Sequence, residues 1–445
     1  MISPSPEQSP ASRQGLLSFS AAARGNRFRQ IALILLFLTA FVEISRVLDF
    51  RPTRIILGLI ALLAISLVAS GRALVFWKCG AGRALPFFVG WVLLSYLLSE
   101  HTEMSSHLVE NVFIGAVLFL AAAAIPVSVS EFKKMFQVIA AAGLLLCVLS
   151  LLRHGYMEGR LVSLWGRNYA DPNYFAMALL GVAPIIWVSF AARPLWIRLC
   201  AGLATALPLL LALRTLSRGG FLAMFAMLVV IFFFCSFKTR IVMASVTTLT
   251  LVVVLAFLPD AMRNRLASAA RIPVGQAAPN ADSVSVDSRT TLLETSIKFT
   301  LAYPVVGVGP GNFGPTLAEF GALQGFKWLD LGTHNSYTQL SSETGIPGLL
   351  LYLLLIFFTL KSLVKVLRQA SPRGAYPEPD LHRLSAGLLV SVVGTCTCMF
   401  FLSEGYGAIN LFWFGLANGL RLLLPEDPEE ETEIVELEPE PAPAH

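Results

Sequence analysis

The sequence predicts an all-α membrane protein with about twelve transmembrane helices. Of its 445 residues, 56% are hydrophobic and only 14% are charged, and the mean hydropathy is +0.70. A water-soluble chain of this length does not need so many apolar residues to fill its core. Apolar runs of roughly 20 residues, the length that a helix needs to cross the hydrocarbon layer, also recur along most of the chain. Composition and run length together indicate an integral membrane protein.

A long polar segment divides the expected helices into two groups. We expect transmembrane helices 1–9 over residues 30–258, an outward-facing loop with short helices over 259–345, and transmembrane helices 10–12 over 346–424. The expected spans are 30–48, 55–71, 84–99, 108–126, 135–152, 173–191, 195–213, 219–236, 241–258, 346–367, 384–403 and 408–424.

The two ends of the chain are expected to lie outside the membrane. Residues 1–29 are polar and rich in Ser and Pro, and they lack the short apolar core of a signal peptide, which predicts a disordered cytoplasmic segment. Residues 425–445 are acidic and contain proline, which predicts a solvated cytoplasmic tail.

The third observation is the distribution of basic residues, which predicts the orientation. Lys and Arg concentrate in cytoplasmic loops, and here they favour one set of alternate loops. We assign this set and both termini to the cytoplasm, although Arg51 and Arg54 do not follow the rule. The basic residues of this set include Arg24, Arg27, Arg29, Arg72, Lys78, Arg83, Lys133, Lys134, Arg193, Lys238, Arg240, Lys361, Lys365, Arg368, Arg373 and Arg383.

Four outward segments contain the residues with the most distinctive chemistry. Their cations are mostly arginine, whose planar guanidinium binds phosphate oxygens in pairs and stays charged at any working pH. This pattern predicts a site for a phosphate or diphosphate. The candidates are Arg167, Asn168, Asp171 and Asn173 in the first segment, Arg214 and Arg218 in the second, Arg289 in the third, and His334, Asn335 and Tyr337 in the fourth.

Each candidate also has a structural explanation. Arg214 can extend to the lipid headgroups from a helix end, whereas Arg218 precedes Gly219 and Gly220, which allow the close approach that a bulky anion requires. In the first segment, we expect Asn173 to cap the following helix, which would account for the DPN sequence there. That role leaves Arg167 and Asn168 free for substrate.

The third segment combines an expected amphipathic helix with the glycine-rich run GVGPGNFG at 307–314. This run lacks the GK[ST] ending of a phosphate-binding P-loop, so we interpret it as a series of tight turns. Arg289, at the head of the expected helix, is either a solvated charge or a ligand for substrate.

His334 is the only histidine of the long outward loop. Its ordinary pKa near 6.5 suits a general base at neutral pH, although an isolated histidine is commonly a structural donor. His101 and His107 lack a nearby third ligand, so we expect no metal site. Among the six cysteines, the pair Cys396 and Cys398 is likewise expected to serve packing.

Four motifs in this order resemble the superfamily of O-antigen ligases and polymerases. They are DPNYFAMALL (171–180), LSRGGFL (216–222), SRTTLLETSIKFTLAYPVVGVGPGNF (288–313) and THNSYTQLSSETGIPGLLLY (333–352), within residues 160–370. The resemblance implies a fold like that of polytopic glycosyltransferases of the GT-C class. It also implies location in the bacterial inner membrane, with the long loop and the active site periplasmic.

By the same resemblance, the donor is a glycan linked to undecaprenyl diphosphate, and the acceptor is lipid A-core or another glycan. His334 would be the catalytic base that deprotonates the acceptor hydroxyl, and Arg218 and Arg289 would bind the diphosphate. Further substrate-binding candidates are Arg214, Asn335 and Tyr337. The first outward segment adds Arg167 and Asn173 to them. The resemblance implies inversion at the anomeric carbon and no cofactor, and we expect membrane lipids but no nucleic acid as partners.

Three functions remain open at this point. A ligase would attach a finished polymer to lipid A-core, and the single dominant outward loop favours this reading over a polymerase that joins lipid-linked units. A transporter would place its polar groups near the bilayer midplane between two related halves. The candidates gather instead at one surface, and the halves show no similarity.

Overall fold

A computed structural model describes residues 27–45, 53–72, 74–100, 102–157, 159–164, 167–191, 193–234, 241, 281–323 and 332–425. The expected N-terminal segment up to residue 26, the expected span 241–258 beyond its first residue, and the acidic tail from 426 lie outside these residues.

The described chain is mostly helical, and eight of its helices are long and apolar enough to cross a membrane. The residues that the structure describes therefore do not show the expected count of about twelve spans. The eight are α2 (Arg27–Ser45), α4 (Gly80–Leu97), α5 (Thr102–Ala124), α6 (Val129–Leu152), α7 (Pro172–Phe190), α8 (Leu195–Arg214), α14 (Ser336–Gln369) and α15 (Pro379–Cys398).

Three further helices are shorter. α3 (Thr53–Ala69) and α9 (Arg218–Phe234) have 17 residues each, and α16 (Ala408–Arg421) has 14. At 1.5 Å per residue, α16 extends about 21 Å, which is less than the roughly 30 Å of a hydrocarbon layer. The difference from the expected span 408–424 arises because the helix already ends at Arg421.

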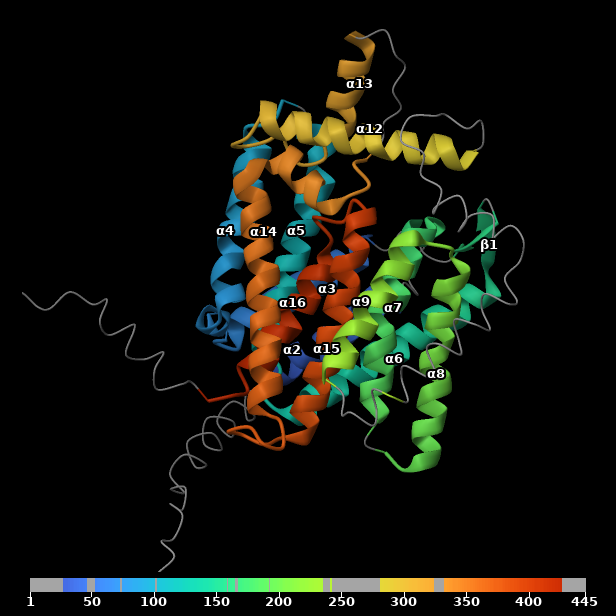
Figure 1. Cartoon of the computed structure of the whole chain (residues 1–445). Helices are drawn as coiled ribbons and strands as arrows, with labels where there is room; N and C mark the ends of the chain where they lie inside the picture. Colours follow the sequence, from blue (N-terminus) through green and yellow to red (C-terminus); the bar gives the residue numbers. More distant parts are fainter. Residues whose placement is uncertain are drawn as a thin grey trace, which may run out of the picture.

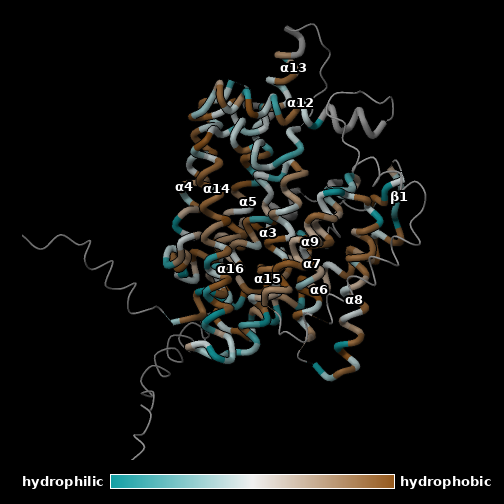
Figure 2. The backbone as a smooth tube through the Cα atoms, in the orientation of Figure 1, coloured by the Kyte–Doolittle hydropathy of each residue, from teal (hydrophilic) through white to brown (hydrophobic). Residues whose placement is uncertain are grey.

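The long helices lie side by side, and α12 (Ala281–Ala302) lies across one end of them (Figure 1). Apolar residues dominate the middle of the bundle and hydrophilic residues its two ends (Figure 2). The remaining elements are the strands β1 (His154–Met157) and β2 (Arg160–Ser163), α13 (Phe313–Leu323), and the 3-10 helices η1 (Val75–Lys78), η2 (Arg167–Ala170) and η3 (Met399–Phe401). α12, with 22 residues, and α13, with 11, lie within the segment 259–345, where short helices were expected.

Side-chain caps define where two of the helices begin at the α12 end. Asp171 caps α7 by accepting hydrogen bonds from the backbone N–H groups of Asn173 (2.6 Å) and Tyr174 (3.2 Å). The expectation that Asn173 is this cap was wrong. Pro172 occupies the first turn, where proline is favoured directly after the cap. Asn335 caps α14 in the same way, through Tyr337 and Thr338.

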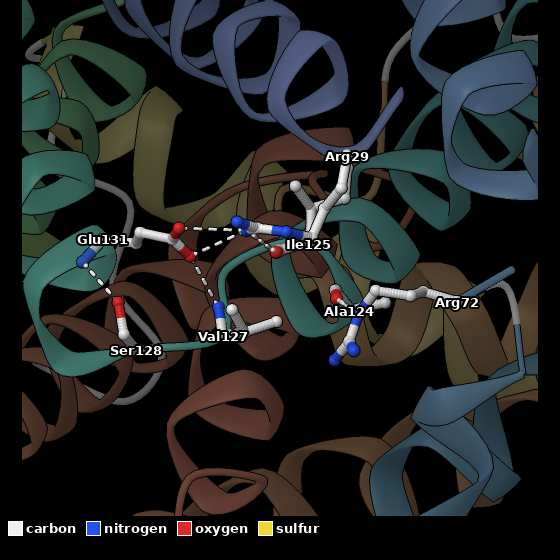
Figure 3. A network of polar contacts seen from close by, with 7 residues as sticks. All are labelled: Arg29, Arg72, Ala124, Ile125, Val127, Ser128 and Glu131. Atoms are coloured by element: carbon white, nitrogen blue, oxygen red, sulfur yellow. Dashed lines mark hydrogen bonds and ion pairs between the residues drawn. The ribbon is translucent and has the colours of Figure 1, made fainter. Parts of the chain in front are cut away.

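At the opposite end of the bundle, a buried ion pair joins α2 to the turn between α5 and α6 (Figure 3). The guanidinium of Arg29 lies 3.0 Å from the carboxylate of Glu131 and donates to the carbonyl of Ile125 (3.2 Å). Glu131 also accepts the N–H of Val127 (2.8 Å). The carboxylate of Glu131 thus pairs with the buried guanidinium of Arg29 and also accepts the N–H of Val127. Because Arg29 also donates to Ile125, these contacts join the start of α2 to the end of α5 and the start of α6.

The glycine-rich run packs against a break in α14. Gly307, Gly309 and Gly311 all have positive φ values, which confirms the expected tight turns. Gly345 breaks the helix with φ 71° and ψ 179°. In two of the contacts across this break, the carbonyls of Ser342 and Pro304 accept the N–H groups of Val308 and Ile346, both at 2.9 Å.

We predict that Gly345→Ala lowers the free energy of unfolding by about 1–3 kcal/mol from backbone strain alone. A Cβ at this position would also lie 2.1 Å from the carbonyl oxygen of Val305. The thermal unfolding midpoint of purified protein, followed by tryptophan fluorescence, measures the loss. Gly90→Ala in α4 is the control, since its Cβ meets nothing within 4 Å. Equal midpoints for the two variants would contradict the role given to the break.

Candidate functional site

His334 lies immediately before α14 in a backbone conformation that is rare for a residue with a side chain. Its φ is 52°, in the left-handed region. Its N–H donates to the hydroxyl of Ser403 (2.9 Å), which also lies 3.2 Å from the hydroxyl of Thr333. The strained backbone is therefore held by a side chain from the loop between η3 and α16.

Further hydrogen bonds attach the same loop to the start of α14. The hydroxyl of Ser336 donates to the carbonyl of Leu402 (2.7 Å) and accepts the N–H of Glu404 (2.9 Å). The side-chain carbonyl of Gln339 accepts the N–H of Gly405 (3.2 Å). These contacts provide hydrogen-bond partners for the irregular backbone between η3 and α16. They also hold this loop next to His334.

The beginning of α7 contacts both the loop that supports His334 and the residue that precedes Arg218. Tyr174 donates its hydroxyl to the carbonyl of Ser403 (3.1 Å). The neighbouring Asn173 accepts through Oδ1 from the hydroxyl of Ser217 (2.8 Å) and from Arg160 (2.8 Å). Asn173 is only 6% exposed. The side-chain oxygen of Asn173 therefore accepts two hydrogen bonds from within the protein. The sequence analysis had listed Asn173 as a substrate-binding candidate.

Arg218 is the first residue of α9, and its side chain is exposed. The hydroxyl of Ser217 accepts the N–H of Gly220 (3.1 Å), so it caps the helix on which Arg218 stands. Gly219 and Gly220 do allow a close approach, but to other helices: a Cβ on Gly219 would lie 2.7 Å from the ring of Phe401, and one on Gly220 would lie 3.2 Å from Ala176. These glycines therefore allow close packing between helices.

Three candidates from distant segments come within electrostatic range of one another. Burial lowers the pKa of Arg289, and the positive charge of Arg218 lowers it further. Burial also lowers the pKa of His334, with a second contribution from the charge of Arg289. The carboxylate of Asp171 opposes both shifts. We call Asp171, Arg218, Arg289 and His334 the polar cluster.

The other candidates have different surroundings. Tyr337 donates its hydroxyl to the carbonyl of Cys396 (2.8 Å), and its ring centre is 4.4 Å from that of Phe400. Arg214 is exposed and donates to the hydroxyl of Tyr156 in β1 (3.2 Å). The Oδ1 of Asn335 accepts the cap bonds of α14, so it is not free for a ligand. The side chains of Arg167 and Asn168 lie outside the described residues.

The sequence interpretation missed Ser403, Arg160 and the charge of Asp171. Asp171 had been explained by the turn alone, although a carboxylate next to several arginines is a signal in itself. Ser403 lies in LSEGYG, residues 402–407. A serine, an acid and two glycines that interrupt an apolar region mark irregular polar backbone, and this pattern could have identified the loop. Among the residues that the structure describes, no group of three His, Cys, Asp or Glu could hold a metal ion.

Comparison with protein families supports the resemblance. A family model described as O-antigen ligase matches residues 203–353, from α8 to the middle of α14. Arg218, Arg289 and His334 all fall within this match, whereas Asp171 and Ser403 lie outside it. A search of curated proteins found no match.

We predict that Asn173→Ala destabilises the α12 end by about 1–3 kcal/mol, because it leaves a buried hydroxyl and a guanidinium without their acceptor. The thermal unfolding midpoint measures this loss. Asn173→Asp keeps an oxygen at the same place, so its midpoint should stay near that of the unmodified protein. An alanine variant as stable as the aspartate variant would refute this role.

Proposed function

We propose that this chain, which carries an O-antigen ligase domain over residues 203–353 and several membrane-length helices, is a membrane glycosyltransferase of that family. In this proposal it transfers a glycan from undecaprenyl diphosphate to lipid A-core at the periplasmic face of the inner membrane. The observation that carries the proposal is the polar cluster, in which Arg289 lies within electrostatic range of Arg218 and His334, and the carboxylate of Asp171 acts on both Arg289 and His334.

The cluster is electrostatically suited to an anion with more than one charge. Two guanidinium groups that repel each other raise the free energy of the empty site, and Asp171 offsets only part of this repulsion. A diphosphate between them would replace repulsion with charge-assisted hydrogen bonds. Arg218 also stands at the first turn of α9, where the helix dipole favours negative charge. These properties favour a ligand such as a lipid-linked diphosphate.

We assign the general base to His334. Burial and the neighbouring cation lower its pKa, so the imidazole is neutral at pH 7 and can accept a proton. In the proposed step, the acceptor hydroxyl attacks the anomeric carbon and gives its proton to the imidazole. The bond from that carbon to the diphosphate oxygen breaks, and undecaprenyl diphosphate leaves with the electron pair. One direct displacement inverts the anomeric configuration.

The developing negative charge on the leaving diphosphate would lie against Arg218 and Arg289. Stabilisation of charge that appears in the transition state is commonly the largest single contribution to catalysis. This assignment requires no cofactor. Lipid A-core, another glycan acceptor and the surrounding lipids complete the proposed set of partners.

The distribution of charge supports the proposed orientation. Residues Arg29, Arg72 and Lys133 lie at the ends of α2, α3 and α6 that are opposite to α12. Basic residues favour the cytoplasmic side. We therefore infer that the α12 end, with the loop 259–345, faces the periplasm, and that both termini are cytoplasmic.

A polymerase of the same superfamily is the alternative, and the two reactions differ in their products. A ligase converts lipid A-core into a long-chain glycolipid, whereas a polymerase lengthens the glycan on undecaprenyl diphosphate. We favour the ligase because one outward segment, 259–345, is much longer than the segment 153–173. Purified protein in vesicles, supplied with both lipids, distinguishes the two by the lipid that gains mass.

We predict that His334→Ala reduces transfer in this assay by about 10²–10⁴-fold, the contribution typical of a general base. His107→Ala is the matched control, since the side chain of His107 is exposed and lies 3.9 Å from that of Glu110, one turn along the same helix. The unfolding midpoint should be unaffected in both variants. A His334 variant with full transfer activity would remove the base assignment.

We predict that Arg218→Lys reduces transfer on the order of 10²-fold, because one ammonium cannot reproduce the paired hydrogen bonds of a guanidinium. The loss should be measured as kcat and KM for the lipid-linked donor. Arg153→Lys, on the exposed residue that ends α6, is the control for loss of an arginine on the same face. If Arg218→Lys changes neither constant, Arg218 does not contact the diphosphate.

A further inference from the structure

α12 has a row of exposed apolar side chains on one side. Leu293, Ile297 and Leu301 follow one another at intervals of four residues and are 39%, 46% and 71% exposed. In the part of the chain that the structure describes, no other element buries them. Tyr303, just after the helix, is 50% exposed as well. A contiguous apolar surface of this kind indicates contact with another phase or molecule.

The position of the row around the helix identifies the direction that it faces. Successive helical residues are rotated by about 100°. Thr300 points toward the bundle, since its hydroxyl lies 2.8 Å from that of Ser341 in α14. The apolar row occupies the next sector of the helix surface. Glu294 and Lys298, both exposed, occupy the sector after that, farther from the bundle.

The row continues the exposed apolar surface of the spanning helices. Val305, 59% exposed, follows the helix. Its neighbours are fixed to two spans: the carbonyl of Pro304 accepts the N–H of Ile346 in α14 (2.9 Å), and the carbonyl of Val306 accepts the hydroxyl of Ser95 in α4 (2.7 Å). Ile346 and Leu350 are 41% and 54% exposed. Apolar exposure therefore extends from the side of α14 to α12.

α12 also has the orientation of a helix at a membrane surface. It lies across the end of the bundle formed by helices such as α4 and α14 (Figure 1). Interfacial helices lie in the membrane plane, with an apolar side in the acyl boundary and a charged side in water. The two exposed sectors of α12 match these two sides.

We propose that α12 is an interfacial helix whose row Leu293, Ile297 and Leu301 lies in the lipid leaflet at this end of the bundle. The occupant of the apolar side is the bilayer itself, with Glu294 and Lys298 in water. Tyr303 would lie at headgroup level, where its amphipathic ring is favoured. This inference does not depend on the transferase proposal.

The placement has a consequence for Arg289. Arg289 lies four residues before Leu293 on the same helix. It is within electrostatic range of Arg218 and Asp171 in the polar cluster. A helix held at the lipid surface fixes the height of this guanidinium at the level of lipid headgroups. A lipid diphosphate that diffuses within the leaflet would meet it without leaving the membrane.

The test uses the full chain with its six native cysteines replaced by alanine. Single cysteines at positions 297, 301 and 298 are labelled with a nitrobenzoxadiazole fluorophore and reconstituted in vesicles of phosphatidylethanolamine and phosphatidylglycerol. Doxyl-labelled lipid quenches a probe in the acyl boundary, and iodide quenches a probe in water. Position 298, one residue from position 297, is the matched control, and position 350 in α14 reports a lipid-facing site.

We expect doxyl lipid to quench the probes at 297 and 301 at least about twofold more than the probe at 298, and iodide to give the reverse order. The probe at 350 should behave like those at 297 and 301. Iodide quenching at 297 equal to that at 298 would overturn the proposal, because the helix would then stand in water. Quenching at 297 by neither agent would also overturn it, since another protein surface would then cover the row.

Discussion

The docking of the glycine-rich turns into the break of α14 is the constraint on which the α12 end depends. A helix cannot accept backbone hydrogen bonds from outside along its regular course, because its carbonyls are already engaged. Beyond the break at Gly345, Ile346 donates to Pro304 and Pro347 has no N–H, so the carbonyls of Ser342 and Glu343 lack their helical donors. They accept the N–H groups of Val308 and Gly309 instead, both at 2.9 Å. The carboxylate of Glu343, 3% exposed, accepts the N–H of Gly311 (2.9 Å) as well. The segment that carries Arg289 is thereby fixed to the segment that carries His334.

A second set of contacts fixes the remaining arginine. Asn173 and Tyr174 are consecutive on α7, and they bond to Ser217 and to the carbonyl of Ser403 respectively. One helix start therefore holds both the segment of Arg218 and the loop that supports His334. Mutual repulsion among cations would separate side chains on flexible loops. Rigid supports on both sides keep them close, and they make the electrostatic energy of the site available to a bound anion.

The sequence predicted much of this arrangement, and the reasons for its failures are physical. Long apolar runs identify helices reliably, and the arginine and histidine residues that meet in the polar cluster were all among the candidates. The cap of α7 was misplaced because both Asp171 and Asn173 are good caps, although proline strongly favours the position directly after the cap. Ser403 was missed because its partners, the N–H of His334 and the hydroxyl of Thr333, lie about 70 residues away in the chain, and only tertiary packing brings them together. The role of Gly219 and Gly220 depended on which surface approaches them, which only tertiary packing decides.

The boundary between lipid and water explains why these features occur together at one end of the bundle. Charged groups deep in hydrocarbon are costly, and a lipid-linked diphosphate keeps its own charge at the headgroup level. Cations that bind such a ligand would therefore lie at the same level, either at the ends of apolar helices, as Arg218 does, or on elements that lie across those ends. α12 satisfies this requirement, since it lies across the ends of the spans with Arg289 near the middle of the helix and an exposed apolar row after it.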